Sequence, residues 1–223
     1  MKEIDFMSSL HKSTKRDYLA RVNDKEYPKH KASELAKKFD FDYWDGDRRI
    51  CYGGYKYIEG RWTNVAKSLI DFYSLKKGSR ILDVGCGKGF LIYELQKIRP
   101  DLEIHGLDIS EYAIFNSKKE IKERLIQGCA TNLPWSENYF DLVISINTLH
   151  CLPIFNLVKA FKEIQRVSSK YKYVCVESYR NEIEKTNLLY WQVTCECFFS
   201  PAEWKWIYEI SEYEGDYSYI FFE

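Results

Sequence analysis

The stretch RILDVGCGKGF at residues 80–90 constrains the fold of this 223-residue chain more than any other feature. An apolar run with one acid, Asp83, leads directly into Gly85, Gly87 and Gly89. Glycine costs about 0.5–1 kcal/mol in regular structure, so this density requires either a sharp turn or the close approach of another group to the backbone. The stretch therefore predicts a buried strand followed by a tight turn and a helix.

From residue 80 onward, apolar strands alternate with helical segments. Strands are predicted at 80–84, 103–108, 125–129, 140–147 and 172–178. Helices are predicted between them at 89–98, 110–122 and 156–167. This alternation is typical of an α/β fold with a doubly wound, mostly parallel sheet that is covered by helices on both faces.

The two ends of the chain depart from this alternation. We expect a helix at 63–75, and near the C-terminus a strand at 194–199, a helix at 201–210 and a last strand at 216–222 that runs antiparallel to the others. Residues 1–40 are charged and helix-prone, and residues 41–62 are dense in Tyr, Trp, Gly and Arg. The predicted organisation is therefore an N-terminal extension with a helical and aromatic lid at 1–62, followed by the main domain at 63–223.

The glycine turn is similar in sequence to two phosphate-binding motifs, but it matches neither of them. A Walker loop needs a Ser or Thr directly after its lysine, whereas Lys88 is followed by Gly89 and Phe90. A dinucleotide-binding turn reads Gly-x-Gly-x-x-Gly, and this turn has one residue fewer before its third glycine. Asp83 would also repel a pyrophosphate. The acid beside the turn instead favours a ligand that carries positive charge.

Several motifs, in this order, resemble those of class I S-adenosylmethionine-dependent methyltransferases (methyltransferase type 11/25-like domain). ILDVGCGKG matches the family motif apolar-Asp-x-Gly-x-Gly-x-Gly, and Asp108 follows Gly89 by 19 positions. Leu133-Pro134-Trp135 and the FDLV stretch at 140–143 resemble two later motifs. The resemblance spans residues 63–178. It implies a Rossmann-like fold, S-adenosylmethionine as cofactor and S-adenosylhomocysteine as product.

The resemblance also implies which residues hold the cofactor. Asp108 would bind the ribose hydroxyls, or else cap the next helix, a role for which Ser110 is also present. Cys129 stands where the family usually has an acid near the adenine amino group, which leaves open how adenine is held. The expected cofactor-binding residues are Asp83, Gly85, Cys86, Gly87, Gly89, Asp108, Ile109, Ala130 and Asn147.

Candidates for the transfer chemistry follow the predicted strands at 140–147 and 172–178. His150 suits a general base because the usual pKa of histidine lies near neutrality, or it lines the pocket without taking a proton. Glu177 would orient the acceptor or form a salt bridge. Cys195 and Cys197 form a close pair, but no further Cys or His lies near them in the sequence, so no metal site is expected.

The aromatic segment at 41–62 would either close over the cofactor or act as a packed cap on the sheet. Its Arg and Tyr side chains suit the carboxylate of the cofactor or an anion on the acceptor. Its flat rings suit a polar ring such as a sugar. The residues expected to contact the acceptor are Tyr43, Arg49, Tyr52, Tyr55, Tyr57 and Arg61.

Charge and cysteine usage narrow the possible partners. Lys+Arg and Asp+Glu both number 33, and a chain without net charge is a poor candidate for a nucleic-acid binder. Seven cysteines, an odd number, indicate reduced thiols and a cytoplasmic location. No apolar run approaches the roughly 20 residues of a membrane span.

These features together predict methyl transfer to the oxygen or nitrogen of a small polar acceptor, with a sugar or sugar nucleotide as one candidate. The alternatives are an RNA or protein methyltransferase that uses the basic residues of 1–40, or a non-catalytic partner subunit with the same fold. The apolar last strand is compatible with a homodimer.

Overall fold

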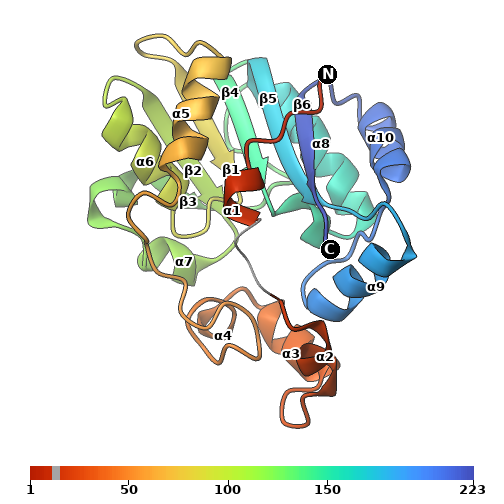
Figure 1. Ribbon diagram of the computed structural model, residues 1–223. Coiled ribbons are helices and arrows are strands. Elements are labelled where there is room, and N and C mark those ends of the chain that lie inside the picture. Colours follow the sequence, from red (N-terminus) through yellow and green to blue (C-terminus); the bar gives the residue numbers. More distant parts are fainter. Residues whose placement is uncertain (12–15) are drawn as a thin grey trace.

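The computed structural model describes residues 1–11 and 16–223. Its centre is a six-stranded sheet in the order β3-β2-β1-β4-β5-β6 (Figure 1). Strand order reverses beside β1, which confirms the predicted doubly wound α/β fold and places a ligand-binding crevice at the carboxyl ends of β1 and β4. The strands are β1 (Arg80–Val84), β2 (Glu103–Asp108), β3 (Leu125–Gln127), β4 (Phe140–Ile146), β5 (Ser168–Glu177) and β6 (Asp216–Ile220).

The prediction that the last strand runs antiparallel is wrong. β6 pairs with β5 in parallel, from Tyr173 opposite Asp216 to Glu177 opposite Ile220. A parallel neighbour needs a crossover of a dozen or more residues, and the connection supplies two helices, α9 (Glu182–Trp191) and α10 (Pro201–Ile210). The strand predicted at 194–199 is irregular chain instead.

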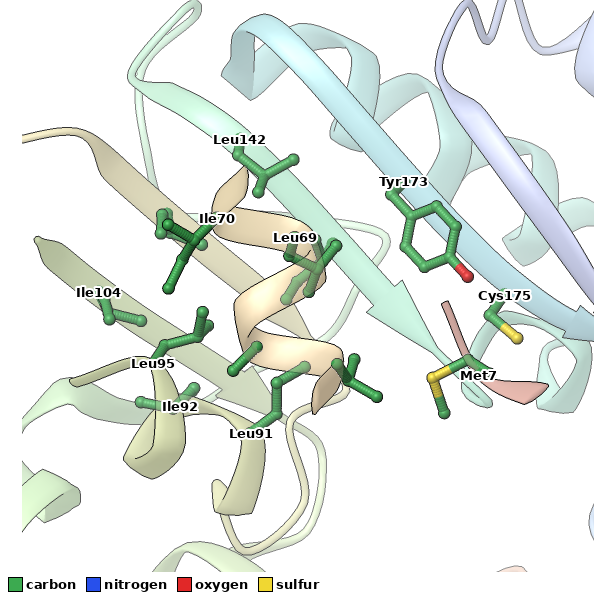
Figure 2. Packing of buried hydrophobic residues seen from close by; sticks show 14 of the residues in the cluster. Met7, Leu69, Ile70, Leu91, Ile92, Leu95, Ile104, Leu142, Tyr173 and Cys175 are labelled. Atoms are coloured by element: carbon green, nitrogen blue, oxygen red, sulfur yellow. The ribbon is translucent and has the colours of Figure 1, made fainter. Parts of the chain in front are cut away.

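Helices cover both faces of the sheet. On one face lie α5 (Thr63–Phe72) and α6 (Phe90–Ile98), and on the other lie α8 (Ile154–Val167) and α10. Neighbouring residues of a strand point to opposite faces, so Ile81 packs under the first pair of helices and Leu82 under the second. Figure 2 shows the first face, where side chains of α5 and α6 lie over those of β2, β4 and β5.

The helix predicted at 110–122 is divided. It consists of α7 (Glu111–Phe115) and a 3-10 helix, η1 (Lys119–Arg124). The side chains of Asn116 and Ser117 bond backward to carbonyls of α7, at 2.8 and 2.7 Å. Such local bonds compete with a continuing helix. A second 3-10 turn, η2 (Leu149–Cys151), follows β4.

The N-terminal residues lie in two places. Met7 and Leu10, the latter in α1 (Ser8–His11), belong to the same buried cluster as α5 and α6. Three further helices lie beyond the carboxyl ends of the strands (Figure 1), and α2 contacts α9. None of the helices in the described part of the chain is long and apolar enough to cross a membrane. The three helices are α2 (Tyr18–Asn23), α3 (Lys29–Ala36) and α4 (Phe41–Trp44).

Candidate functional site

The turn after β1 requires glycine for two reasons. Gly85 has a φ of +80°, and a Cβ at this position would lie 2.1 Å from Thr148 Oγ1. Gly87 has a φ of +56°, and its Cβ would lie 2.8 Å from the ring of Trp44. Both the left-handed backbone and the closeness of the neighbouring side chains exclude a larger residue. The turn therefore presents bare backbone at the carboxyl edge of the sheet.

A cavity of about 210 Å³ lies against this turn, and we term it the glycine-loop cavity. Its walls come from the ends of β1, β2 and β4 and from aromatic residues of the lid. Gly89, which is also predicted to bind the cofactor, does not line this cavity; it is the N-cap of α6, where a Cβ would meet Ile121 and Leu125. The other predicted cofactor-binding residues all line the cavity: Asp83, Gly85, Cys86, Gly87, Asp108, Ile109, Ala130 and Asn147.

The glycine-loop cavity carries acids, and its described lining residues include no Lys, Arg or His. Burial, and then the nearby charge of Asp108, raises the pKa of Asp83 to about 7. Burial also raises the pKa of Asp108, opposed by its two hydrogen bonds to backbone amides. The buried Oδ1 of Asn147 has no hydrogen-bond partner among the described residues. This set of acceptors suits a ligand that brings positive charge and hydroxyl donors.

Asp108 does not cap the following helix. Its Oδ2 accepts from the amide of Gly87 at 2.6 Å, and its Oδ1 accepts from the amide of Ser110 at 2.8 Å. Ser110 is the N-cap of α7, because its Oγ accepts from the amide of Ala113 at 3.0 Å. The carboxylate of Asp108 therefore joins the glycine turn to the end of β2, at the edge of the cavity.

Two contacts attach the lid to the carboxyl edge of the sheet, one at Ser110 after β2 and one at Lys88 in the glycine turn. Trp44 donates from Nε1 to Ser110 Oγ at 2.9 Å and stacks on Tyr52, with ring centroids 5.5 Å apart and an interplanar angle of 5°. Lys88, in the turn, forms a 2.7 Å ion pair with Asp45 and donates to the carbonyl of Tyr55 at 2.9 Å. The side chain of Lys88 is only 5% exposed. The lid is therefore attached to the main sheet through a buried charge.

A second cavity, of about 420 Å³, lies beside the first, and we term it the arginine cavity. His150, Glu177 and Trp191 line it, together with the cationic residues Arg16, Arg21, Arg48, Lys56 and Arg61. The two cavities have a common wall, which consists of Tyr43, Tyr52, Tyr55, Trp62, Phe90, Asn147 and Cys151.

The two predicted catalytic residues are brought together at this second cavity. His150 Nε2 lies 3.3 Å from Glu177 Oε2, and both side chains are buried. Burial lowers the pKa of His150 to about 3 and raises that of Glu177 to about 8. Gln192 donates to the other carboxylate oxygen of Glu177. At neutral pH the pair is therefore mostly uncharged, and Glu177 is the member that ionises just above neutrality.

The lid residues that are predicted to contact the acceptor lie partly in the cavity walls and partly outside both cavities. Tyr43, Tyr52 and Tyr55 lie in the common wall, and Arg61 lines the arginine cavity. Two others line neither cavity. They are Arg49, which pairs with Asp47 and Glu26 on the surface, and Tyr57, whose hydroxyl donates to Glu94.

Sequence reasoning missed several residues of the site. One sequence feature could have predicted the Lys88–Asp45 pair: Lys88 lies inside a glycine turn that lacks a phosphate-binding pattern, so its charge needs another partner. Arg16 and Arg21 had no such feature, because they lie in a segment far in sequence from the other residues of the site. Within residues 1–11 and 16–223, no three His, Cys, Asp or Glu side chains are grouped so as to hold a metal ion.

Comparison with known proteins identifies the family. Residues 75–215 match a family model described as a methyltransferase domain. The chain is 33% identical over 110 residues to an uncharacterized methyltransferase of Bacillus subtilis, covering 48% of this chain and 56% of that protein. It is 36% identical over 106 residues to demethylmenaquinone methyltransferase of Staphylococcus carnosus, covering 45% and 43%. It is also 36% identical over 130 residues to tRNA (carboxymethyluridine(34)-5-O)-methyltransferase of Arabidopsis thaliana, covering 58% and 30%.

Solved structures agree on the fold. The YcgJ protein of Bacillus subtilis superposes with a TM-score of 0.52 at 20% identity, over 66% of each chain. A protein of Bacillus halodurans superposes with a TM-score of 0.54 at 18% identity, over 66% of this chain and 67% of that one. The chain spans from about a third to just over half the length of the curated relatives named above. Because the family model covers more than half of the chain, the protein belongs to the methyltransferase domain family.

Proposed function

We propose that this enzyme transfers the methyl group of S-adenosylmethionine to the oxygen or nitrogen of a small polar acceptor bound in the arginine cavity. The observation that carries the proposal is the common wall. An acidic cavity and a basic cavity meet at Asn147, and His150 and Glu177 lie on the basic side. A cationic donor and a separate acceptor thus each have a site of suitable charge, side by side.

The glycine-loop cavity fits the cofactor by its donor set. Bare backbone at Gly85 and Gly87 admits a close ligand, and the remaining acceptor sites of Asp108 suit ribose hydroxyls. Asp83 and the unpartnered Oδ1 of Asn147 suit positively charged or hydrogen-donating groups. Cys129 also lines the cavity, and its thiol lies 3.0 Å from Thr131 Oγ1.

His150 and Glu177 are proposed to take the proton that the acceptor loses. When bound, the cofactor supplies a methyl carbon whose bond electrons return to sulfur while the acceptor forms the new bond. His150 Nδ1 is a buried atom without a hydrogen-bond partner in the described residues, and Glu177 Oε2, apart from its 3.3 Å contact with His150 Nε2, has no hydrogen bond there either. Unpartnered polar atoms in a cavity wall cost about 1–3 kcal/mol each, and this cost falls when a ligand bonds to them.

Calorimetric titration with S-adenosylmethionine and S-adenosylhomocysteine tests the cofactor site. We expect micromolar binding of both to the full chain, and a loss of about tenfold or more in Asp108→Asn, since a carboxylate bond to a hydroxyl is worth about 1.5–3 kcal/mol. Asp71→Asn, an exposed change on α5, is the control. Equal affinity in Asp108→Asn and Asp71→Asn would contradict the assignment of Asp108.

The acceptor is sought with a methyl-labelled donor. Label in a low-mass fraction supports the small-molecule proposal, and sugars and sugar nucleotides are resolved within that fraction. One relative is named as a tRNA methyltransferase, so the same extract is divided into an RNase-treated arm and an untreated arm. Label that appears only in RNA or in protein would replace a small acceptor by a macromolecular one.

A further inference from the structure

Three guanidinium groups gather around one indole at the far side of the arginine cavity. The Cζ atoms of Arg16, Arg21 and Arg48 lie 5.9, 5.1 and 5.7 Å from the ring centroid of Trp191. Arg16 precedes α2, Arg21 lies within it, Arg48 belongs to the lid, and Trp191 ends α9. Segments distant in sequence therefore converge there, in the region where α2 lies beside α9 (Figure 1).

This cluster has no anion of its own. In the described part of the chain, no carboxylate lies within 4.0 Å of any of the three guanidinium groups, in contrast to Arg49 and Arg180, which are both paired. Arg21 donates to the carbonyl of Ile50 at 3.0 Å, which satisfies hydrogen bonding without neutralising the charge.

The cluster is also partly desolvated. The Nε of Arg16 is buried and has no hydrogen-bond partner among the described residues. Burial lowers the pKa of Arg21, and the positive charge of Arg48 lowers it further, against a contribution from Asp24 that raises it. Buried like charges repel, and an anion between them removes both the repulsion and the lost hydration.

The rest of the cavity does not supply that anion. Lys56 and Arg61 add two more cations to its lining, and Glu177 is the only acid among its described lining residues. Burial keeps the pKa of Glu177 near 8, so its carboxyl is mainly neutral at pH 7. The cavity is therefore strongly positive when it holds no ligand.

We propose that the methyl acceptor carries an anionic group, a carboxylate or a phosphate, which binds at Arg16, Arg21 and Arg48 while its reacting end lies at His150. This inference rests on the proposed function and adds the chemical class of the acceptor. Guanidinium groups suit both anions because they donate two parallel hydrogen bonds. The anion site and the proton-accepting pair are adjacent, since Gln192, which follows Trp191, bonds to Glu177.

The size of the cavity favours a small molecule over a nucleic-acid strand. Its volume of about 420 Å³ is within the range of sites for small ligands. Strand binders instead have a basic groove that extends over several nucleotides. The aromatic wall of Tyr43, Tyr52 and Trp62 would contact the body of the acceptor.

Two pairs of probes, each an anion and a neutral compound with the same ring, test the charge requirement on the full chain with saturating S-adenosylhomocysteine. They are benzoate with benzamide, and phenyl phosphate with phenol, measured by calorimetry at constant ionic strength. We expect at least one anion to bind about tenfold or more tightly than its neutral partner, and the pair that responds identifies carboxylate or phosphate. Equal affinities within both pairs, or no binding of either anion at millimolar concentration, would overturn the proposal.

Variants of Arg16 test whether the anion binds at the arginine cluster. Arg16→Gln should weaken the preferred anion about tenfold, and Arg16→Lys should restore most of the affinity because it keeps the charge. Arg124→Gln, the same change outside both cavities, should have no effect. An unchanged anion affinity in Arg16→Gln would show that the anion binds elsewhere and would overturn the assignment.

The same experiments separate this proposal from the proposed function. If the wild-type chain fails to bind S-adenosylhomocysteine, the cofactor site is wrong whatever the anions do. If it binds S-adenosylhomocysteine, and Arg16→Gln does so equally well, any loss of anion binding belongs to the arginine cavity alone. In the labelling experiment, we expect the label in the low-mass fraction retained by an anion-exchange resin. Label only in the neutral fraction or in RNA contradicts an anionic small acceptor.

Discussion

The glycine-loop cavity and the arginine cavity share an aromatic wall but differ in charge and in the origin of their residues. The first has Asp83 and Asp108 and no cation among its described lining residues. The second has, among the lining residues that the structure describes, five Arg and Lys residues and one acid, Glu177. Two ligands of opposite charge can therefore bind side by side at one edge of the sheet, with Tyr43 and Tyr52 between their charged groups.

The difference in origin explains how the two sites are held. The acids of the first cavity lie on neighbouring parallel strands, so the sheet itself fixes their positions. The cations of the second lie on the N-terminal segment and the lid, and their positions depend on how these pack against α9. We therefore expect the glycine-loop cavity to be robust and the arginine cavity to be sensitive to changes far from it in sequence.

The largest effect should come from Glu177, the only acid among the described residues that line the arginine cavity. Glu177→Gln removes a group that ionises near pH 8 and should lower the rate of label transfer about 10²–10⁴-fold, the usual contribution of a general base. In the wild-type enzyme kcat/KM should rise with pH through about 8, because the ionised carboxylate accepts the proton, and this rise should disappear in the variant.

Two measurements keep this prediction specific. Binding of S-adenosylhomocysteine should be unchanged in Glu177→Gln, since Glu177 does not line the glycine-loop cavity. Glu196→Gln, which removes an exposed partner of Lys37, should leave the rate unaltered. A variant Glu177→Gln that keeps both its rate and its rising pH profile would assign the proton to another group.

The next effect concerns the attachment of the lid. Asp45→Asn leaves Lys88 charged, 5% exposed and without its carboxylate. Losing one partner of a buried pair costs about 3–5 kcal/mol, and the 23% exposure of Asp45 reduces the expected loss of unfolding free energy to about 1–3 kcal/mol. Glu59→Gln, which breaks the exposed pair with Lys97, should cost close to nothing in the same denaturant titration. Equal costs would mean that Lys88 does not hold the lid.

A smaller effect separates backbone strain from crowding at the glycine turn. Gly85 and Gly78 have nearly the same φ, +80° and +78°, but only at Gly85 would a Cβ meet another residue, Thr148 at 2.1 Å. Alanine should cost about 1–2 kcal/mol at either position through its left-handed conformation. Crowding should add about 1–2 kcal/mol at Gly85 alone. Equal losses of unfolding free energy at the two positions would show that the turn or Thr148 shifts at little cost to make room for the Cβ.

The sequence predicted the first cavity far better than the second, for a physical reason. The glycine turn and Asp108 are local features, since a strand, a tight turn and a strand end each have their own pattern. The direction of β6 depends on how two helices return over the sheet, so the apolar pattern of 216–222 could not determine it. Likewise no local pattern marks Arg16 and Arg21 as neighbours of Trp191, because their contact exists only after α2 packs on α9.

The smallest expected effect is a pH dependence of stability in which the two cavities act in the same direction. Glu177 and Asp83 have folded pKa values of about 8 and 7, above their usual values of 4.5 and 3.8. The folded state therefore keeps protons that the unfolded state has released, and stability falls as pH rises through this window. The pKa of His150 is shifted the other way, from 6.5 to about 3, so it adds stability as pH rises from about 3 to 6.5 and opposes the carboxyls there. Above pH 6.5 the opposing contribution of His150 fades, and the two carboxyls dominate the slope.

Between pH 6.5 and 8 the unfolding free energy of the wild-type chain should accordingly fall by an amount on the order of 1 kcal/mol. Glu177→Gln should remove about two thirds of this slope and Asp83→Asn about one third, because Asp83 ionises about one pH unit earlier than Glu177. Saturating S-adenosylhomocysteine should change the contribution of Asp83 and leave that of Glu177 nearly intact, since only Asp83 lines the glycine-loop cavity. A slope that the ligand removes entirely would mean that the two cavities are electrostatically one site, and that the aromatic wall does not separate them.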